Sequence, residues 1–370
     1  MSNLKDLLES VPDKDTTWET IGSLSTIVAT DHIDKSNYRP QGKYPVISQA
    51  SEFISGFTDQ GNAMPKDEYI CFGDHTLCVK FIDFSFVQGA DGLKILKVRD
   101  KQTIYPKYFY YCVQIAASNL PSGYERHWKL LRQFSLPIPP LEVQKRIADT
   151  LDKFTELETE LETELEERNR QYGYYRGKLI HNGAPEVPLK DFVAITKGKQ
   201  LNKELCSKVQ TEKTPFPVIN GGMMPSGFWN EFNFDKGKIT IAQGGKSGGF
   251  VSWQTLPFWA GAHCFVVSNF DNKKLNYRYL YYFLKEKQAD LQSQKQGATI
   301  PSLSADALLL LNIPLPPLET QKEIADVLDK FTSLTSSVKV GIPAEISLRR
   351  KQMEWYRDAM FKALYSEEEK

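Results

Sequence analysis

The sequence predicts an α+β protein in which two pseudo-symmetric α/β domains are separated by two long helices packed as an antiparallel coiled coil. Three observations predict this architecture: a phrase that occurs twice, a helical apolar seam that begins inside each copy, and short β-rich runs upstream of each copy. With 370 residues, the chain has room for two or more domains that each bury a core.

The repeated phrase is "PPLEVQKRIADTLDKFTEL" from Pro139 and "PPLETQKEIADVLDKFTSL" from Pro316. The likeness extends upstream, where "YPVIS" at Tyr44 matches "FPVIN" at Phe216 and "KYFYY" at Lys107 matches "RYLYY" at Arg278. A globular part and a helical part are therefore duplicated together. Two copies indicate a pseudo-two-fold protein, not a solenoid.

The first globular part, residues 1–138, has β-rich runs such as "YICF" and "LCVKFI" and one aromatic helix, "PKYFYYCVQIAA". The helical segment that follows, residues 139–183, places apolar residues at a three-four spacing. A helix from near Glu142 to near Ile180 is expected, about 58 Å long at 1.5 Å per residue. It contains three tandem "TELE" units, at Thr155, Thr159 and Thr163. Each unit adds about 6 Å to the helix and rotates the residues that follow by only about 40°. The number of units can therefore change while the apolar residues stay on nearly the same face of the helix.

The second globular part, residues 184–315, repeats this pattern with "KITIA", "CFVV" and the helix "NYRYLYYFLKEK". The second helical segment, residues 316–366, is expected from near Glu319 to near Lys362. Gly341 and Pro343 in "VGIPAE" must kink or break it, and it has no tandem unit that matches the "TELE" repeats. Such helices also suit a homodimer zipper, but the internal repeat favours pairing within one chain.

The formal net charge is +0, which conceals opposite local balances. Residues 141–170 hold ten acids and five bases, a net −5, and leave about +5 on the rest of the chain. A nucleic-acid partner is therefore not excluded. The amino terminus lacks the basic start and apolar run of a signal peptide, so the expected compartment is the cytoplasm.

Two motifs in the globular parts are incomplete. "GGKSGG" around Lys246 resembles a phosphate-binding loop, but that pattern requires a glycine where Thr240 stands. Cys71, His75 and Cys78 could supply three zinc ligands, but a fourth is not apparent. Signatures of hydrolases, zinc proteases, amino-methyltransferases and translocases are missing, which favours a binding module over an enzyme.

The repeated phrases, the tyrosine-rich endings "RQYGYYRGKLI" and "RKQMEWYRDAM", and the tandem "TELE" units resemble the specificity (S) subunits of type I restriction-modification systems. The resemblance covers nearly the whole chain. It implies two target recognition domains, residues 1–138 and 184–315, held apart by two spacer helices, residues 139–183 and 316–366. Each domain would read one half of a split double-stranded DNA target.

The resemblance also implies partners and a division of labour. Two modification (M) subunits would hold S-adenosylmethionine and methylate adenine, and restriction (R) subunits would use ATP and Mg to translocate and cut. The S subunit itself would hold no cofactor or metal and do no chemistry. In the family, the tetrapeptide units set the spacing between half-sites, and about 6 Å is close to two base pairs.

Candidate contacts follow from loop chemistry, since Lys and Arg suit phosphates and Gln, Asp and His reach base edges. The expected DNA contacts are Asp74, His75, Thr76, Lys80, Arg126 and His127 in the first domain and Lys197, Lys199, Gln243, Lys246, Ser247 and Thr299 in the second. The expected partner contacts are Gln144, Lys145, Gln321 and Lys322. Two rival functions remain: a coiled-coil scaffold without DNA readout, and a DNA-modifying enzyme complete in one chain, for which no cofactor pocket is found.

Overall fold

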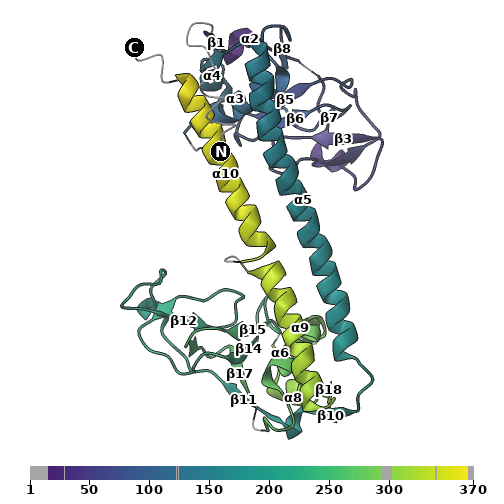
Figure 1. The fold of residues 1–370 in the computed structure, drawn as a ribbon, viewed down its shortest axis with the longest axis vertical. Helices are drawn as coiled ribbons and strands as arrows, with labels where there is room; N and C mark the ends of the chain where they lie inside the picture. Colours follow the sequence, from purple (N-terminus) through teal and green to yellow (C-terminus); the bar gives the residue numbers. More distant parts are fainter. Residues whose placement is uncertain are drawn as a thin grey trace. The chain divides into compact units, whose positions relative to one another are not determined.

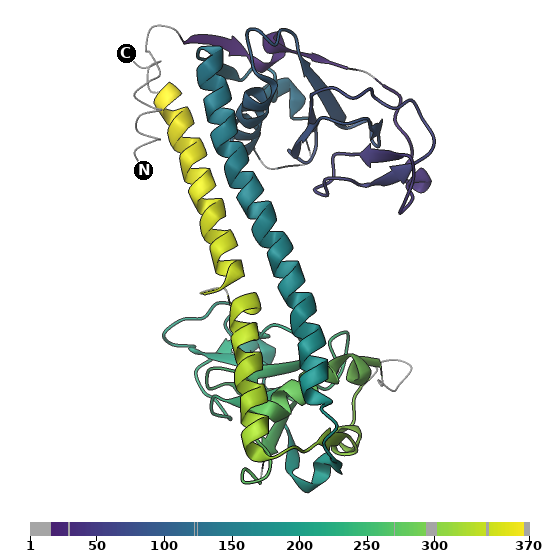
Figure 2. The ribbon, with the colours of Figure 1, turned by 45° about the vertical axis from the view of Figure 1, so that its right-hand side comes forward.

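The chain forms two compact units, seen in Figures 1 and 2. The computed structural model describes residues 16–28, 30–121, 123, 125–269, 271–293, 302–337 and 340–365. Unit 1 comprises Met1–Glu160 and Ile346–Lys370, and unit 2 comprises Leu161–Glu345. Each unit thus combines a globular part with segments of both helical parts.

Unit 1 contains a four-stranded antiparallel sheet, a three-stranded sheet and a strand pair. Its strands are β1 (Thr17–Thr20), β2 (Ser25–Ile27), β3 (Tyr44–Ile47), β4 (Gly56–Thr58), β5 (Tyr69–Gly73), β6 (Val79–Ile82), β7 (Val87–Gln88), β8 (Leu93–Val98) and β9 (Ser135–Ile138). The large sheet has the order β2-β8-β5-β6, the small sheet has the order β4-β3-β7 with β3 parallel to β7, and β1 pairs with β9. The helices of its globular part are α2 (Ile21–Leu24), η1 (Lys35–Asn37), α3 (Pro106–Ser118) and α4 (Trp128–Leu131).

Unit 2 repeats this topology strand for strand. Its strands are β10 (Glu186–Pro188), β11 (Val193–Lys197), β12 (Phe216–Ile219), β13 (Phe228–Trp229), β14 (Lys238–Ala242), β15 (Val251–Gln254), β16 (Trp259–Ala260), β17 (Cys264–Asn269) and β18 (Asn312–Pro314). The sheet orders are β11-β17-β14-β15 and β13-β12-β16, with β12 parallel to β16, and β10 pairs with β18. Its shorter helices are η2 (Leu189–Asp191), η3 (Lys203–Leu205), α6 (Tyr277–Glu286), α7 (Gln288–Ser293) and α8 (Ala305–Leu309). The duplicated globular fold predicted from the sequence is confirmed.

The long helices are α5 (Leu141–Ile180), α9 (Leu318–Ser336) and α10 (Ile342–Tyr365). The predicted break lies between α9 and α10, where Gly341 has a φ of +92°. A Cβ atom at this position would lie 2.5 Å from the Leu334 carbonyl oxygen. Both the positive φ and this close approach therefore require glycine. No helix in the described part of the chain is long and apolar enough to cross a membrane.

The helices pack antiparallel inside each unit. In unit 1, Phe154 of α5 stacks on Tyr356 of α10, and four residues later Glu158 pairs with Arg350. Rising numbers on α5 thus meet falling numbers on α10, and both views show α10 alongside the first half of α5. In unit 2, Tyr175 of α5 stacks on Phe331 of α9. The predicted antiparallel packing of the helical segments is confirmed.

Each globular part buries its aromatic helix against the start of one long helix. In unit 1 the core joins Tyr108 and Phe109 of α3 to Ile147 and Leu151 of α5. The equivalent core of unit 2 joins α6 to α9, and it contains the buried residues Tyr279, Leu280, Tyr282, Phe283, Ile324, Ala325 and Leu328. The repeated phrase is therefore a packing surface, because its apolar residues seat each long helix on its own domain.

Candidate nucleic-acid interface

In unit 1, hydrogen bonds hold the loop after β3 against the turn after β5. The Thr76 hydroxyl donates to the Gln49 carbonyl at 2.5 Å, and the His75 amide donates to Gln49 Oε1 at 3.3 Å. The Asp74 amide donates to the Gly92 carbonyl at 2.8 Å, which adds the start of β8. We call residues 48–55, 73–78 and 89–92 loop cluster 1.

Unit 2 assembles the equivalent segments in the same way. The Gln243 amide donates to the His263 carbonyl at 2.8 Å, as Asp74 does to Gly92. The His263 amide in turn donates to Asn220 Oδ1 at 2.9 Å. We call residues 220–226, 243–250 and 261–263 loop cluster 2. The fold thus brings loops distant in sequence to one edge of each unit.

Several predicted DNA contacts lie exposed at or beside these clusters. In unit 1, Thr76 and Arg126 are exposed, and His75 Nδ1 lies 3.0 Å from the Glu125 carbonyl oxygen. In unit 2, the exposed lysines are Lys197, Lys199 and Lys246, and Ser247 is partly exposed. The Lys199 amide donates to the Ala260 carbonyl at 2.8 Å, which fixes the segment after β11 beside β16. Thr299 lies outside the described residues.

Gln243 combines partial exposure with an unused hydrogen-bond acceptor. Its backbone is fixed on both sides, since the amide bonds to His263 and the carbonyl accepts from the Leu303 amide at 2.7 Å. Its side-chain Oε1 is buried and has no hydrogen-bond partner within the described residues. The oxygen itself is out of reach of a ligand in this conformation. The side chain as a whole is partly exposed, and a glutamine amide that turns outward matches the N6 and N7 edge of adenine.

Three residues predicted to contact DNA are instead buried inside unit 1. Asp74 Oδ1 accepts from the Trp128 amide at 2.7 Å, and the Lys80 ammonium donates to the carbonyls of Ser48 and Glu52 at 2.9 and 2.6 Å. The two ring nitrogens of the fully buried His127 each lie 3.0 Å from a carbonyl oxygen. Direct DNA contact by Asp74, Lys80 and His127 is therefore corrected to a structural role. Burial also lowers the pKa of Lys80.

The predicted partner contacts divide in the same way. Gln144 is fully buried: its Oε1 accepts from the Tyr105 amide at 2.8 Å, and its Nε2 donates to the carbonyls of Thr103 and Pro139. Gln321 makes the equivalent bonds to Asn276, Lys274 and Pro316. Both glutamines tie a long helix to the aromatic helix of its own unit, so neither is available to a partner. Lys145 and Lys322 are exposed.

The sequence interpretation missed the apolar tips of the clusters. Phe53 and Ile54 in loop cluster 1 and Met223 and Met224 in loop cluster 2 are all exposed. The repeat alignment carried the signal, since "ISQASEFISGF" at Ile47 and "INGGMMPSGF" at Ile219 place two apolar residues in the same loop of each copy. Both tips thus present exposed apolar side chains at equivalent places of the repeat.

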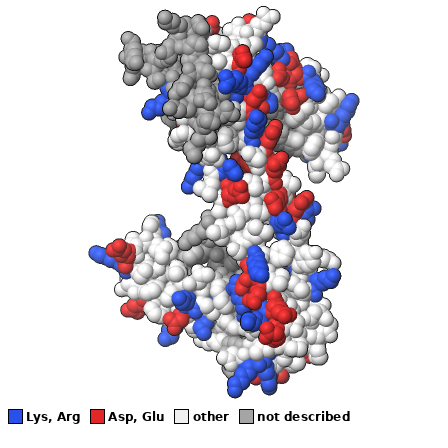
Figure 3. Space-filling view, in the orientation of Figure 1, with Lys and Arg blue, Asp and Glu red and all other residues white. Residues whose placement is uncertain are grey.

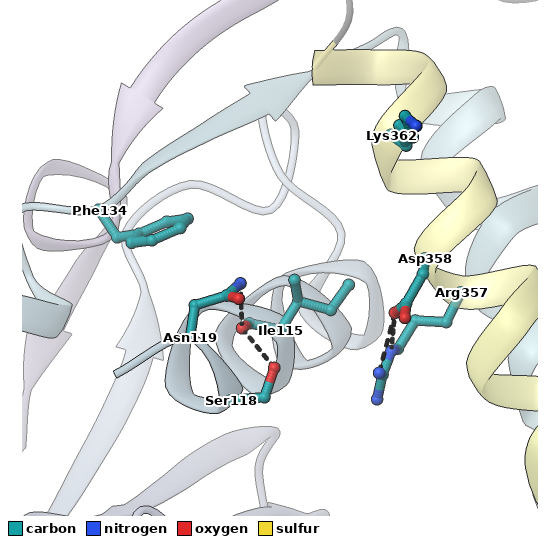
Figure 4. Close-up of a pocket in the computed structure, with 7 residues that line it drawn as sticks. All are labelled: Ile115, Ser118, Asn119, Phe134, Arg357, Asp358 and Lys362. Carbon is teal, nitrogen blue, oxygen red and sulfur yellow. Dashed lines mark hydrogen bonds and ion pairs between the residues drawn. The ribbon is translucent and has the colours of Figure 1, made fainter. Parts of the chain in front are cut away.

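The surface charge and the pocket beside α10 do not point to a particular ligand. On the face in Figure 3, acidic and basic side chains are interspersed over both units. A pocket of about 330 Å³ in unit 1, drawn in Figure 4, lies between the end of α3 and α10. It is lined by Ile115, Ser118, Asn119, Phe134, Arg357, Asp358 and Lys362. Arg357 and Asp358 pair with each other at 2.9 Å, and Lys362 adds one further positive charge to the lining.

The cysteine and histidine residues form no metal site in the part of the chain that the structure describes. Cys71 is fully buried in β5, and burial raises the pKa of its thiol to about 12.

Comparison with known proteins agrees with this architecture. The chain matches the family model for the type I restriction modification DNA specificity domain over residues 15–168 and 183–348. It is 26% identical to the EcoR124I/EcoR124II specificity subunit of Escherichia coli, with 98% of this chain and 97% of that one covered. It is 27% identical to a putative type I restriction enzyme specificity subunit of Haemophilus influenzae, over 97% of this chain and 99% of that one.

Solved structures share the fold. The S subunit of the type I restriction-modification system from M. genitalium superposes with a TM-score of 0.61 at 20% identity, over 96% of this chain and 97% of that one. The family model matches most of the chain and both repeats, and members of this family are non-catalytic DNA specificity components. The chain therefore belongs to the specificity (S) subunits of type I restriction-modification systems.

Proposed function

We propose that this S subunit reads a bipartite double-stranded DNA target, with loop cluster 1 at one half-site and loop cluster 2 at the other. One observation carries the proposal. The two units share strand order and loop construction, but they differ in the side chains that the clusters present. Equal scaffolds with unequal loops are what two different half-sites require, because base contacts specify and backbone contacts only position.

The exposed residues divide by chemistry. Arg126, Lys197, Lys199 and Lys246 would neutralise phosphates and make binding dependent on salt. Gln243, whose side chain is partly exposed, and His75 would reach base edges, each worth roughly 1–3 kcal/mol of discrimination if bidentate. Thr76 and Ser247 would add hydroxyl contacts to either. Thr299 remains a sequence-based candidate.

The assignment to domains follows the repeats. Residues 1–138 and 184–315 would be the target recognition domains, and residues 139–183 and 316–366 the spacer helices. Two M subunits would bind, with Lys145 and Lys322 near their contacts, and R subunits would join them in the cytoplasm. S-adenosylmethionine, ATP and Mg would belong to those partners.

The "TELE" units would set the distance between half-sites. They lie within α5, which is one uninterrupted helix. Removing four residues shortens a helix by about 6 Å, close to two base pairs, and turns it by only about 40°. The apolar residues of α5 before and after the removed unit therefore stay on nearly the same face of the helix.

The test is methylation-site mapping. The chain is co-expressed with the M subunit encoded beside it, and N6-methyladenine is located in the host DNA. A split motif with an undefined spacer is expected, and deletion of residues 159–162 should shorten the spacer and leave both halves unchanged. An unsplit motif would overturn the two-reader proposal. A stable, active complex without any methylated motif would favour the scaffold alternative.

A further inference from the structure

In unit 1, a buried ammonium holds the loop between β3 and β4 against the large sheet. Lys80 of β6 is only 4% exposed, and its Nζ donates to the carbonyls of Ser48 and Glu52 at 2.9 and 2.6 Å. Hydrogen bonds of this kind are strong because one partner is charged. Both bonds go to backbone oxygens of loop cluster 1, so the position of that loop depends on this side chain.

In unit 2, a serine stands at the position of Lys80. Lys80 pairs with Cys71 across β6 and β5, and Ser252 pairs with Thr240 at the same register of β15 and β14. Serine keeps only the first carbon of a lysine side chain and lacks the three further methylenes and the ammonium. Ser252 is therefore too short to hold a loop as Lys80 does.

The loop itself is anchored in the same way in both units. The serine of the closing "SGF" donates its amide hydrogen to the carbonyl of the valine in the preceding strand, at 2.9 Å in unit 1 and 2.8 Å in unit 2. In the repeat alignment, Ser48 corresponds to Asn220 and Glu52 corresponds to Met223. The residues that supply carbonyls to Lys80 in unit 1 thus have counterparts in unit 2.

A cavity of about 110 Å³ in unit 2 lies between Ser252 and this loop. Asn220 and Met223 both line it, so it lies at the place that the Lys80 side chain fills in unit 1. At about 30 Å³ for each water molecule, the cavity has room for about three waters. A propylammonium ion, which is the part of lysine that Ser252 lacks, is of similar size.

Substitutions along the two strands also make this cavity polar. Cys71 and Ile82 belong to an apolar cluster of unit 1, and Thr240 and Gln254 stand at their registers in unit 2. Both polar residues line the cavity and are buried. Gln254 Nε2 donates to Thr240 Oγ1 at 2.7 Å, so the carbonyl oxygen is the end of this amide that can accept from a ligand. Buried polar groups require hydrogen-bond partners, which favours a polar guest.

We infer that this cavity binds a primary alkylammonium ion, which takes the place of the Lys80 side chain and fixes the loop at residues 220–226. The acceptors suit its N–H donors, because Gln254, Ser252 and the loop supply oxygens and the lining holds no charged side chain. Met223 and Phe250 supply apolar walls for the alkyl part. The inference goes beyond the proposed function, since it concerns a ligand of the free chain. Either a free linear amine or a lysine side chain of another protein can supply this chemistry.

The experiment follows the thermal unfolding midpoint of the full chain in increasing concentrations of propylammonium chloride. Tetramethylammonium chloride at the same concentrations is the reference, because that ion has the same charge but no N–H donor. At about ten times its dissociation constant, propylammonium should raise the midpoint by about 3–6 °C over the reference. A rise with 1,4-diaminobutane but not with Nα-acetyl-lysine methylamide would assign the site to a free amine, and the reverse would assign it to a lysine side chain.

Reciprocal substitutions locate the response. Ser252→Lys supplies the ammonium from the chain itself, so it should raise the midpoint in buffer and lose the response to propylammonium. Lys80→Ser gives unit 1 the cavity that unit 2 has, so its lowered midpoint should recover in part with propylammonium. Ser293→Lys is the matched control, because it adds the same charge at an exposed position of unit 2, and it should keep the wild-type response.

Equal midpoints of the wild-type chain in propylammonium and tetramethylammonium would overturn the inference and leave the proposed function standing. An undiminished response of Ser252→Lys would overturn it too, because the amine would then bind elsewhere. An equal rise in potassium chloride would assign the cavity to a metal cation and overturn the alkylammonium ligand. An unsplit methylation motif, with the amine response intact, would overturn the proposed function alone.

Discussion

The Tyr111 hydroxyl donates a hydrogen bond to Asp152 Oδ1 at 2.7 Å and thereby links the aromatic helix α3 to the long helix α5. Lys107 pairs with the same carboxylate. Unit 2 repeats the arrangement, with Tyr282 and Arg278 on Asp329. The acid lies inside the repeated "LDKF". The repeated phrase therefore supplies both the apolar residues that pack each long helix on its domain and the carboxylate that bonds it to the aromatic helix, an interaction that we call the polar lock.

Tyr111→Phe should lower the free energy of unfolding by about 1.5–3 kcal/mol, because it removes one hydrogen bond to a charged, partly buried acceptor. Urea denaturation followed by circular dichroism measures this loss. Tyr174→Phe, which removes an exposed hydroxyl, is the matched control and should change stability by less than about 0.5 kcal/mol. Equal effects of the two variants would contradict the lock.

Gln144→Ala should cost about 2–3 kcal/mol of stability, because it leaves the Tyr105 amide and two carbonyls without their buried partner. Gln321→Ala should cost a similar amount through Asn276. Lys145→Ala, one residue along on the exposed side of the helix, should be nearly neutral. A Gln144→Ala protein with unchanged stability but lost M-subunit binding would restore the partner contact that the sequence predicts.

Lys80→Met separates a structural lysine from a phosphate contact. Its ammonium holds the carbonyls of Ser48 and Glu52, so the variant should loosen loop cluster 1 and weaken DNA binding at every salt concentration. The slope of log affinity against log salt should not change, because no phosphate contact is lost. A slope reduced by about one, measured by fluorescence anisotropy, would show that Lys80 contacts DNA.

How far the sequence predicts this molecule depends on the kind of signal. The repeat, the bounds of α5 and the break before α10 are local in the chain, through identity, heptad spacing, glycine and proline, and all three were predictable. Burial of a polar residue is not local. Asp74 and His127 look like surface loop residues in sequence. Only the bond from the Trp128 amide to Asp74 and the contact of the His127 ring with the Asp74 carbonyl, both between segments far apart in the chain, show otherwise. The paired loop tips were visible in the repeat alignment but resemble ordinary surface residues without the fold.

Stability should depend on pH through Lys285. Burial, with a further contribution from the positive charge of Arg176, lowers the pKa of Lys285 to about 8, against an unfolded value of about 10.5. Between these two values the unfolded chain holds one more proton, so the contribution of Lys285 to stability rises with pH through this window. Below about pH 8 Lys285 is protonated in both the folded and the unfolded state, so the full free-energy cost of burying its charge is present. The stability of the wild type relative to Lys285→Met should therefore rise from pH 8 to pH 10.5 in urea titrations, and a flat difference would rule out the shift.

The two half-sites should respond to separate substitutions. Gln243→Ala removes a base-reading side chain from loop cluster 2, so one position of one half-site should become degenerate, at a cost of about 1–3 kcal/mol for the preferred base. The other half-site should be unchanged, because loop cluster 1 is built from its own residues. Lys199→Ala is the contrasting variant: it should weaken binding to all sequences alike and reduce the salt slope by about one. Methylation-site mapping measures the first effect and anisotropy at several salt concentrations the second. Loss of specificity in both half-sites on changing Gln243 would mean that the two clusters do not read DNA independently.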